Sequence, residues 1–201
     1  EVHLEGDAVD DGLGGQHDTC LFVMRRLVHA VRLGAMTDAL AHPDRRAEWD
    51  ALRDAHLRDR EDRPPSTARG VHHVALLCQD VERTIDFYQG LLEFPLTDLF
   101  QNRDYKGSTH FFFDIGNGNT IAFFDFPGLD LGPYAEVLGG LHHLAISVEP
   151  ANWDRLKAKL DDDGIPYQHI SGTSIYFNDP DGTRLELISD PLGHMYGADV
   201  L

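Results

Sequence analysis

Apolar residues follow two different spacings in the last two thirds of the chain, and these spacings alternate twice in the same order. A short apolar run of strand length comes first. A stretch with apolar residues three or four positions apart, as on one helix face, comes next, and three further strand-like runs follow. The pattern predicts two βαβββ units. We expect first-unit strands at 71–77, 94–100, 109–115 and 120–126 with a helix from Asp80 to Gly90, and second-unit strands at 141–148, 167–170, 174–177 and 184–188 with a helix that carries Trp153, Leu156 and Leu160 and ends at Gly164.

The two units also repeat each other in sequence. The segment GVHHVAL at 70–76 returns as GLHHLAI at 140–146, and GNTIAF at 118–123 returns as GTRLEL at 182–187. A repeat of this kind indicates two copies of one structural unit. Each copy opens with two histidines at the start of a predicted strand, so the same potentially functional side chains occur in both copies.

The first part of the chain has a different residue composition from the repeated units. Residues 1–17 are rich in Gly and Asp, and we expect them to be disordered. Met36 is a natural start, so residues 1–35 are interpreted as an upstream extension. Residues 44–60 are highly charged and predict a surface helix, and residues 63–67 have linker composition. We therefore expect an N-terminal extension at 1–67 and one main domain at 68–197, with its units at 70–127 and 140–190.

Composition excludes some classes of function. The formal net charge of −17 argues against general binding to nucleic acid or to an anionic membrane surface. No apolar run approaches the length of a membrane span, and two cysteines cannot form a disulfide framework. We expect a cytoplasmic protein whose partner is a small molecule.

The paired βαβββ units, the HHVA segment at a strand start and the closing segment DPDGTRLEL resemble the vicinal oxygen chelate superfamily. This superfamily includes glyoxalase I, bleomycin- and fosfomycin-resistance proteins and extradiol dioxygenases. The resemblance implies an α+β fold in which paired βαβββ modules form a cupped mixed sheet. It also implies a divalent metal in the cup.

By this resemblance the metal ligands are His73, His143 and Glu186. Side chains alternate along a strand, so we expect His72 and His142 to point away from the cup. The alternative interpretation of a single strand histidine is a hydrogen-bonded core or edge residue. The alternative for Glu186 is a salt bridge to a neighbouring Arg or Lys. The same histidine in both copies favours ligation.

Ala122 stands in the first copy where Glu186 stands in the second, because each lies four residues after the aligned glycine. Alanine cannot bind a metal, so three protein ligands and vacant positions remain. Two histidines and one carboxylate form the triad of non-haem Fe(II) oxygenases. Fe(II) is therefore the expected metal, with Mn(II), Zn(II) and Ni(II) as alternatives.

The segment from His169 through Tyr176 to Glu186 resembles the extradiol dioxygenase signature. By this resemblance His169 and Tyr176 would be hydrogen-bond donors near the substrate; the alternative is that they only pack or face solvent. Ring-cleaving relatives carry an acid–base histidine where this chain has Asn119, which cannot transfer a proton at neutral pH. His110 is the nearby substitute.

Phenylalanines crowd the first-unit strands, and those that face the cup would line a pocket for an aromatic substrate. The sequence therefore predicts a metal-dependent, extradiol-type dioxygenase that acts on a small aromatic diol. A glyoxalase I-like lyase or isomerase is the alternative enzyme, and a bleomycin-resistance-type drug-binding protein is the non-enzyme alternative. Whether the cup closes within one chain or across a homodimer stays open.

Overall fold

The computed structural model describes residues 43–201. Our expectations for residues 1–35 lie outside the described residues. The charged segment forms helix α2 (Arg46–His56), followed by the short 3₁₀ helix η1 (Arg60–Asp62). No residue of α2 is buried, in agreement with the predicted surface helix. No helix in the described part of the chain is long and apolar enough to cross a membrane.

Residues 64–201 form a compact unit that begins with the first βαβββ module. Strand β1 (His73–Leu77) leads into α3 (Val81–Ile85), which continues as the π-helical turn η2 (Asp86–Leu91). Strands β2 (Leu96–Gln101), β3 (Thr109–Asp114) and β4 (Thr120–Phe124) follow. The sheet order is β1-β4-β3-β2, and β1 runs parallel to β4 while the other neighbours are antiparallel.

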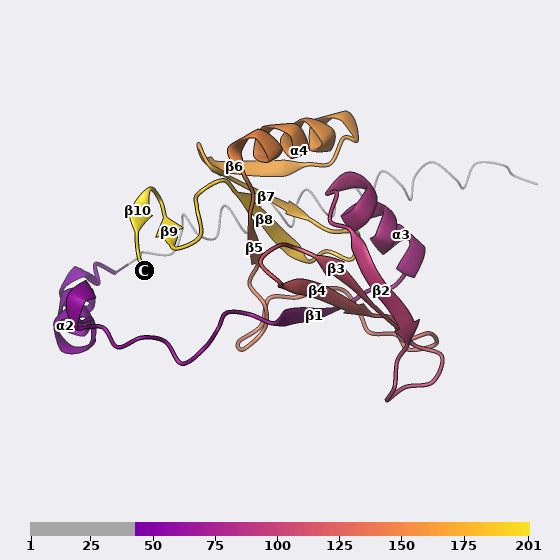
Figure 1. Ribbon diagram of the computed structural model, residues 1–201, viewed down its shortest axis with the longest axis horizontal. Helices are drawn as coiled ribbons and strands as arrows, with labels where there is room; N and C mark the ends of the chain where they lie inside the picture. The colour runs from indigo at the N-terminus through magenta and orange to yellow at the C-terminus, as the bar shows by residue number, and fades with distance from the viewer. Residues whose placement is uncertain (1–42) are drawn as a thin grey trace, which may run out of the picture. The chain divides into compact units, whose positions relative to one another are not determined.

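The second module repeats this topology. It contains β5 (Leu144–Ser147), α4 (Pro150–Asp162), β6 (Tyr167–Ser171), β7 (Ser174–Asn178) and β8 (Arg184–Ile188), in the sheet order β5-β8-β7-β6. The predicted α+β class with paired βαβββ modules is confirmed, with one four-stranded mixed sheet per module (Figure 1). A small hairpin of β9 (His194–Met195) and β10 (Ala198–Asp199) follows and was not predicted.

Strands β1 and β5 begin two and three residues later than predicted. The partner of β1 is β4, which starts at Thr120 after a tight turn, and His73 already pairs with this first residue. Earlier residues therefore have no strand to pair with. In consequence His72 and His142 precede their strands, and strand alternation does not govern the direction of their side chains.

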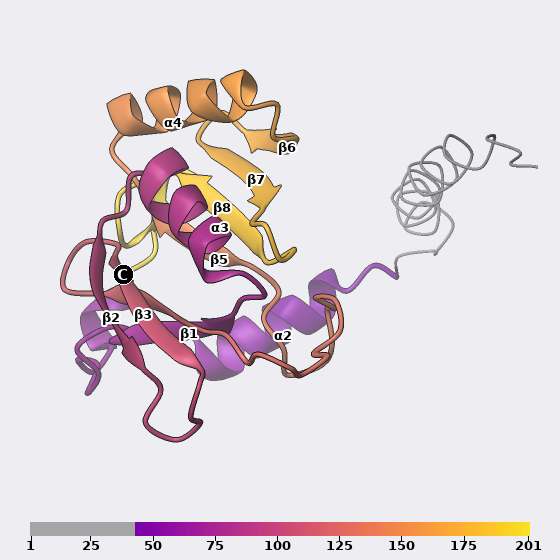
Figure 2. The same cartoon turned by 90° about the vertical axis from the view of Figure 1, so that its right-hand side faces the viewer.

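The two modules share one hydrophobic core, which lies between the helix-bearing faces of the two sheets. Tyr88 of η2 stacks on Phe113 of the first sheet, with ring centroids 5.3 Å apart, and Phe87 contacts Phe177 of the second sheet at 6.3 Å. Figure 2 shows α4 across the second sheet and α3 between the two sheets. We call the opposite face of each sheet, turned away from this core, its outer face.

Hydrogen bonds connect the two modules at the turn between β7 and β8. The buried Tyr88 hydroxyl donates to Asp179 Oδ2 at 3.1 Å, and Asp179 Oδ1 accepts the backbone N–H of Thr183 at 2.8 Å. Arg83 Nη2 donates to Asp181 Oδ1 at 2.7 Å. The Asp-Pro-Asp-Gly turn therefore joins the two modules as well as connecting two strands.

Candidate metal centre

Strand pairing determines which residues share an outer face. In the first sheet Ala75 pairs with Ala122, and in the second sheet Ala145 pairs with Glu186. Paired residues in neighbouring strands project to the same side of a sheet. The neighbours of Glu186 in β8, Leu185 and Leu187, are fully buried in the shared core, so Glu186 belongs to the outer face. Ala122 is thus the structural counterpart of Glu186, as the repeat predicts.

Glu186 and His143 meet on the outer face of the second sheet. His143 Nε2 lies 3.1 Å from Glu186 Oε2, and the Glu186 side chain is buried. The other carboxylate oxygen, Oε1, accepts a hydrogen bond from the Ser174 hydroxyl. Ser174 was not among the predicted site residues, although its position two residues before Tyr176 on one strand places it on the same face. Ser174 therefore orients the carboxylate so that Oε2 faces His143.

Tyr176 borders this pair, as predicted. Its ring centroid is 5.3 Å from that of His143, and Arg184 lies over its ring with Cζ 4.7 Å from the centroid. Burial, together with a hydrogen bond from the Tyr176 hydroxyl to Glu186 and the negative charge of that carboxylate, raises the pKa of Tyr176 to about 12. The phenol therefore stays protonated at neutral pH and can donate a hydrogen bond.

The outer face of the first sheet carries His73 and His110. The His110 imidazole stacks on Phe124 at a centroid distance of 3.9 Å and contacts Phe112 at 4.3 Å and Phe100 at 5.3 Å. Its Nε2 is buried and has no hydrogen-bond partner within the described part of the chain. Burial, with a smaller contribution from the charge of His73, lowers the pKa of His110, so this imidazole is neutral at pH 7. The predicted aromatic surface therefore surrounds a neutral histidine.

The phenylalanines of the first sheet divide between its two faces, as strand alternation predicts. Phe111, Phe113 and Phe123 are fully buried in the shared core. Phe112 and Phe124 lie on the outer face beside His110, since Phe112 pairs with Ala122 and Phe124 pairs with His110.

The structure does not bring His73 to His143 and Glu186 within one chain. Among residues 43–201, no three His, Cys, Asp or Glu side chains lie close enough together to hold a metal ion. The physical reason is the shared core, which turns the two outer faces away from each other. One chain therefore presents two half-sites, His73 on one sheet and His143 with Glu186 on the other.

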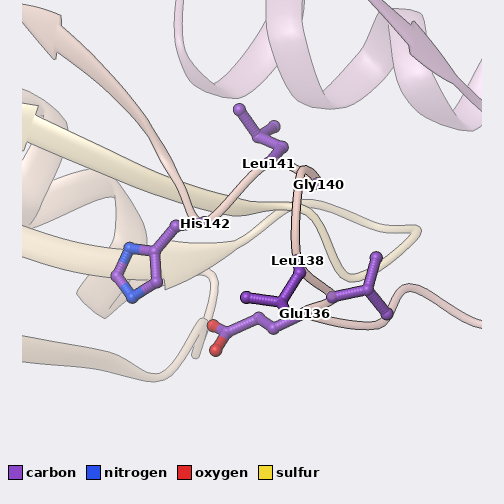
Figure 3. Close-up of a pocket in the computed structure, with 6 residues that line it drawn as sticks. Glu136, Leu138, Gly140, Leu141 and His142 are labelled. Atoms are coloured by element: carbon purple, nitrogen blue, oxygen red, sulfur yellow. The ribbon is translucent and has the colours of Figure 1, made fainter.

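Two predicted positions differ in the structure. His72 and His142 do not turn away from the candidate ligands: His72 Nδ1 lies 2.9 Å from His73 Nδ1, and His142 Nδ1 lies 2.6 Å from His143 Nδ1. His72 and His142 can contact the next histidine because both precede the regular strands. His142 also lines a pocket together with Glu136, as Figure 3 shows.

His169 does not lie near the other candidate site residues, contrary to the prediction. It pairs with Ile175, whose side chain is in the shared core, and its ring contacts Trp153 of α4 at a centroid distance of 5.6 Å. It therefore lies on the helix-bearing face, away from Tyr176 and Glu186. Gln168 is the residue that pairs with Tyr176. Asn119 lies in the turn directly before β4, next to Thr120, the pairing partner of His73.

The side chains of the half-sites fit a divalent metal. Imidazole nitrogen and carboxylate oxygen are common ligands of Fe(II), Mn(II) and Zn(II). Two ligand atoms that each lie about 2.1 Å from one ion would be roughly 3.0–3.4 Å apart. His143 Nε2 and Glu186 Oε2 are 3.1 Å apart, which matches this separation. The carboxylate is buried, and a bound cation would compensate the cost of its desolvation.

Comparison with known proteins agrees with this fold. Residues 70–187 match the model of the Glyoxalase/Bleomycin resistance protein/Dioxygenase superfamily. MhqA of Bacillus subtilis (strain 168), a proposed ring-cleaving dioxygenase, is 26% identical over 142 residues, which is 65% of this chain and 43% of MhqA. The chain therefore spans less than half the length of this relative.

Two further similarities extend this result. The metallothiol transferase FosB of Lysinibacillus sphaericus (strain C3-41) is 25% identical over 133 residues, 60% of this chain and 82% of FosB. The crystal structure of a proposed dioxygenase from Bacillus subtilis subsp. subtilis str. 168 superposes with a TM-score of 0.54 at 26% identity, over 62% of this chain and 41% of that chain. With its two βαβββ modules and this match over most of their length, the chain belongs to the Glyoxalase/Bleomycin resistance protein/Dioxygenase superfamily.

Proposed function

We propose that this protein is a metal-dependent enzyme whose metal is held by His143 and Glu186 of one chain and by His73 of the partner subunit in a homodimer. The observation that carries the proposal is the 3.1 Å approach of His143 Nε2 to Glu186 Oε2 on an outer face where residues 43–201 supply no third ligand. In a two-fold dimer, the outer face of the first sheet of one chain can cover the outer face of the second sheet of the other. Each chain then completes one site in its partner.

For the reaction we propose extradiol-type cleavage of a small aromatic diol by O₂. The position that matches Glu186 holds Ala122, so three protein ligands leave room for substrate. The outer face of the first sheet is aromatic, with Phe112, Phe124 and Phe100 around His110. The similarity to MhqA, named for ring cleavage, supports the same reaction class.

A bound divalent metal would supply a Lewis acid that lowers the pKa of the substrate hydroxyl groups. The protein residues act around it. Ser174 holds the Glu186 carboxylate in one orientation, and the protonated Tyr176 phenol can donate a hydrogen bond beside it. His110 is neutral and can accept a proton from the substrate, which Asn119 cannot do. The phenylalanine rings around His110 give a flat aromatic substrate an apolar surface to pack on.

A glyoxalase-like lyase or isomerase is the second candidate. The observation that favours it is the match to FosB, which covers 82% of FosB. FosB is named as a metallothiol transferase, which indicates thiol chemistry in that relative. In that reaction Glu186 would serve as both ligand and base. A drug-binding protein without metal is less consistent with the chain, because His73, His143 and Glu186 are all in place on outer faces.

The test is oxygen consumption by anaerobically purified, Fe(II)-loaded protein. With catechol-type diols we expect O₂ uptake and a yellow ring-opened product, and little turnover of methylglyoxal with a thiol. Glu186→Gln should abolish both metal retention and uptake. Asn119→His adds an acid–base group beside the pairing partner of His73 and should speed cleavage. Isomerase activity with Ni(II) or Zn(II) and without O₂ uptake would support the second candidate and contradict the first.

A further inference from the structure

A histidine pair with the same internal contact occurs in both modules. His72 and His73 approach through their Nδ1 atoms at 2.9 Å, with ring planes at 78° and centroids 5.1 Å apart. His142 and His143 do the same at 2.6 Å, with an angle of 75° and centroids 4.9 Å apart. The contact is repeated at equivalent positions of two modules whose surrounding loops differ. It is therefore a feature of the repeated unit and not of one loop.

The backbone of the first histidine in each pair is held in place. Thr120 N–H donates to the His72 carbonyl oxygen at 3.3 Å. The Tyr134 hydroxyl lies 3.2 Å from the His142 carbonyl oxygen and 2.5 Å from that of Leu141. Different groups thus anchor the same backbone position in the two modules. Each anchor holds the backbone of the residue whose ring contacts the next histidine.

An Nδ1-to-Nδ1 contact determines where the ring protons can lie. A neutral imidazole has one N–H and one lone pair, so in such a contact one ring donates and the other accepts. A histidine that binds a metal through Nε2 needs its lone pair there and carries its proton on Nδ1. The ligand must then be the donor, and the histidine before it must be the acceptor. For His143 the required Nε2 is the atom that lies 3.1 Å from Glu186 Oε2.

We propose that His72 and His142 are positioning residues that accept the Nδ1 proton of His73 and His143 and so direct the Nε2 lone pairs of these two ligands to the metal. This inference rests on the proposed metal function. It assigns a role to the first histidine of each HH segment, which strand alternation alone would turn away from the site. Hydrogen-bond partners of metal-bound histidines raise the basicity of the ligand and fix its ring orientation, and their loss typically weakens metal binding by about 10–100-fold.

The experiment measures Zn²⁺ binding to the full chain by calorimetry, since Zn²⁺ is diamagnetic and redox-inert. His72→Leu and His142→Leu remove the acceptor, and each should weaken Zn²⁺ binding by roughly 10–100-fold. His142→Asn places an amide oxygen near the position of Nδ1, so it should recover most of the lost affinity. His56→Leu, in the exposed helix α2, is the control and should bind as the wild type does.

A second readout follows the protons directly. In ¹⁵N NMR spectra of the Zn²⁺-loaded wild type, His73 and His143 should carry their proton on Nδ1, and His72 and His142 should carry theirs on Nε2. Thermal unfolding of each metal-free variant shows whether the fold is retained. If the wild type binds Zn²⁺ and both leucine variants bind equally well, the positioning role is wrong and the metal site stands. If the wild type binds no divalent metal, the proposed function fails and this inference fails with it.

Discussion

Ala122 and Glu186 occupy the same place in the two modules: Ala122 pairs with Ala75 in the first sheet, and Glu186 pairs with Ala145 in the second. The two modules therefore have equivalent strand pairing at this position but side chains of different chemistry. One module offers a carboxylate at this place and the other offers a methyl group, which is fully buried. This asymmetry limits the proposed site to three protein ligands.

Installing a carboxylate at the alanine should restore the symmetry. We expect Ala122→Glu to bind divalent metal more tightly and to lose O₂-dependent turnover, because it would fill a position that substrate needs. The metal-free variant should lose about 1–3 kcal/mol of unfolding free energy from overpacking. Ala122→Gln has the same size without the charge, so it should lose similar stability and gain no affinity. Equal metal affinity for the Glu and Gln variants, by calorimetry, would contradict this assignment.

The contact between Tyr88 and Asp179 should be important for stability. Tyr88 is fully buried and donates to a carboxylate that is also buried, so Tyr88→Phe leaves Asp179 Oδ2 without its donor. We expect a loss of about 1–3 kcal/mol in unfolding free energy, measured by urea denaturation. Tyr105→Phe changes a partly exposed ring and should stay within about 0.5 kcal/mol of the wild type. Equal losses for both variants would show that the modules do not depend on this hydrogen bond.

The same contact predicts a pH dependence. Burial raises the pKa of Asp179 above its ordinary value. The folded protein thus holds this proton more tightly than the unfolded chain does, so the contribution of Asp179 to stability falls as pH rises from about 4 through the raised pKa. Asp179→Asn keeps an oxygen for the two backbone N–H donors and removes the titration. The unfolding free energy of Asp179→Asn relative to the wild type should therefore increase over this pH range, and a constant difference would contradict the argument.

Local sequence patterns predicted most of the fold. The eight strands of the two modules lie within a few residues of the predicted ranges, because alternation and helix spacing are local properties. The alignment of Ala122 with Glu186 also follows from the repeat alone. The strand limit at His73 was less predictable, since it depends on where the partner strand starts.

The wrong predictions about the site concern features that local sequence pattern does not determine. His169 follows a short family signature, but its pairing with Ile175 puts it on the helix-bearing face, next to an irregular step in the β6–β7 register. His72 and His142 lie outside the strands, so alternation did not apply to them. The separation of His73 from His143 and Glu186 follows from how two modules pack, and the Tyr88–Asp179 contact spans 91 residues. No local pattern carries that information.

If two chains build one metal site, two variants that are each defective in one ligand should restore a site when they are mixed. His73→Ala and Glu186→Ala should each lose metal, but a heterodimer of the two contains one intact site and one doubly defective site. After random subunit exchange, about a quarter of the wild-type metal content should return. Mixing His143→Ala with Glu186→Ala is the matched control and should restore none, because both residues come from the same chain. Recovery in the first mixture alone is the predicted result, and no recovery in either mixture, with both variants folded and exchanging subunits, would contradict a shared site.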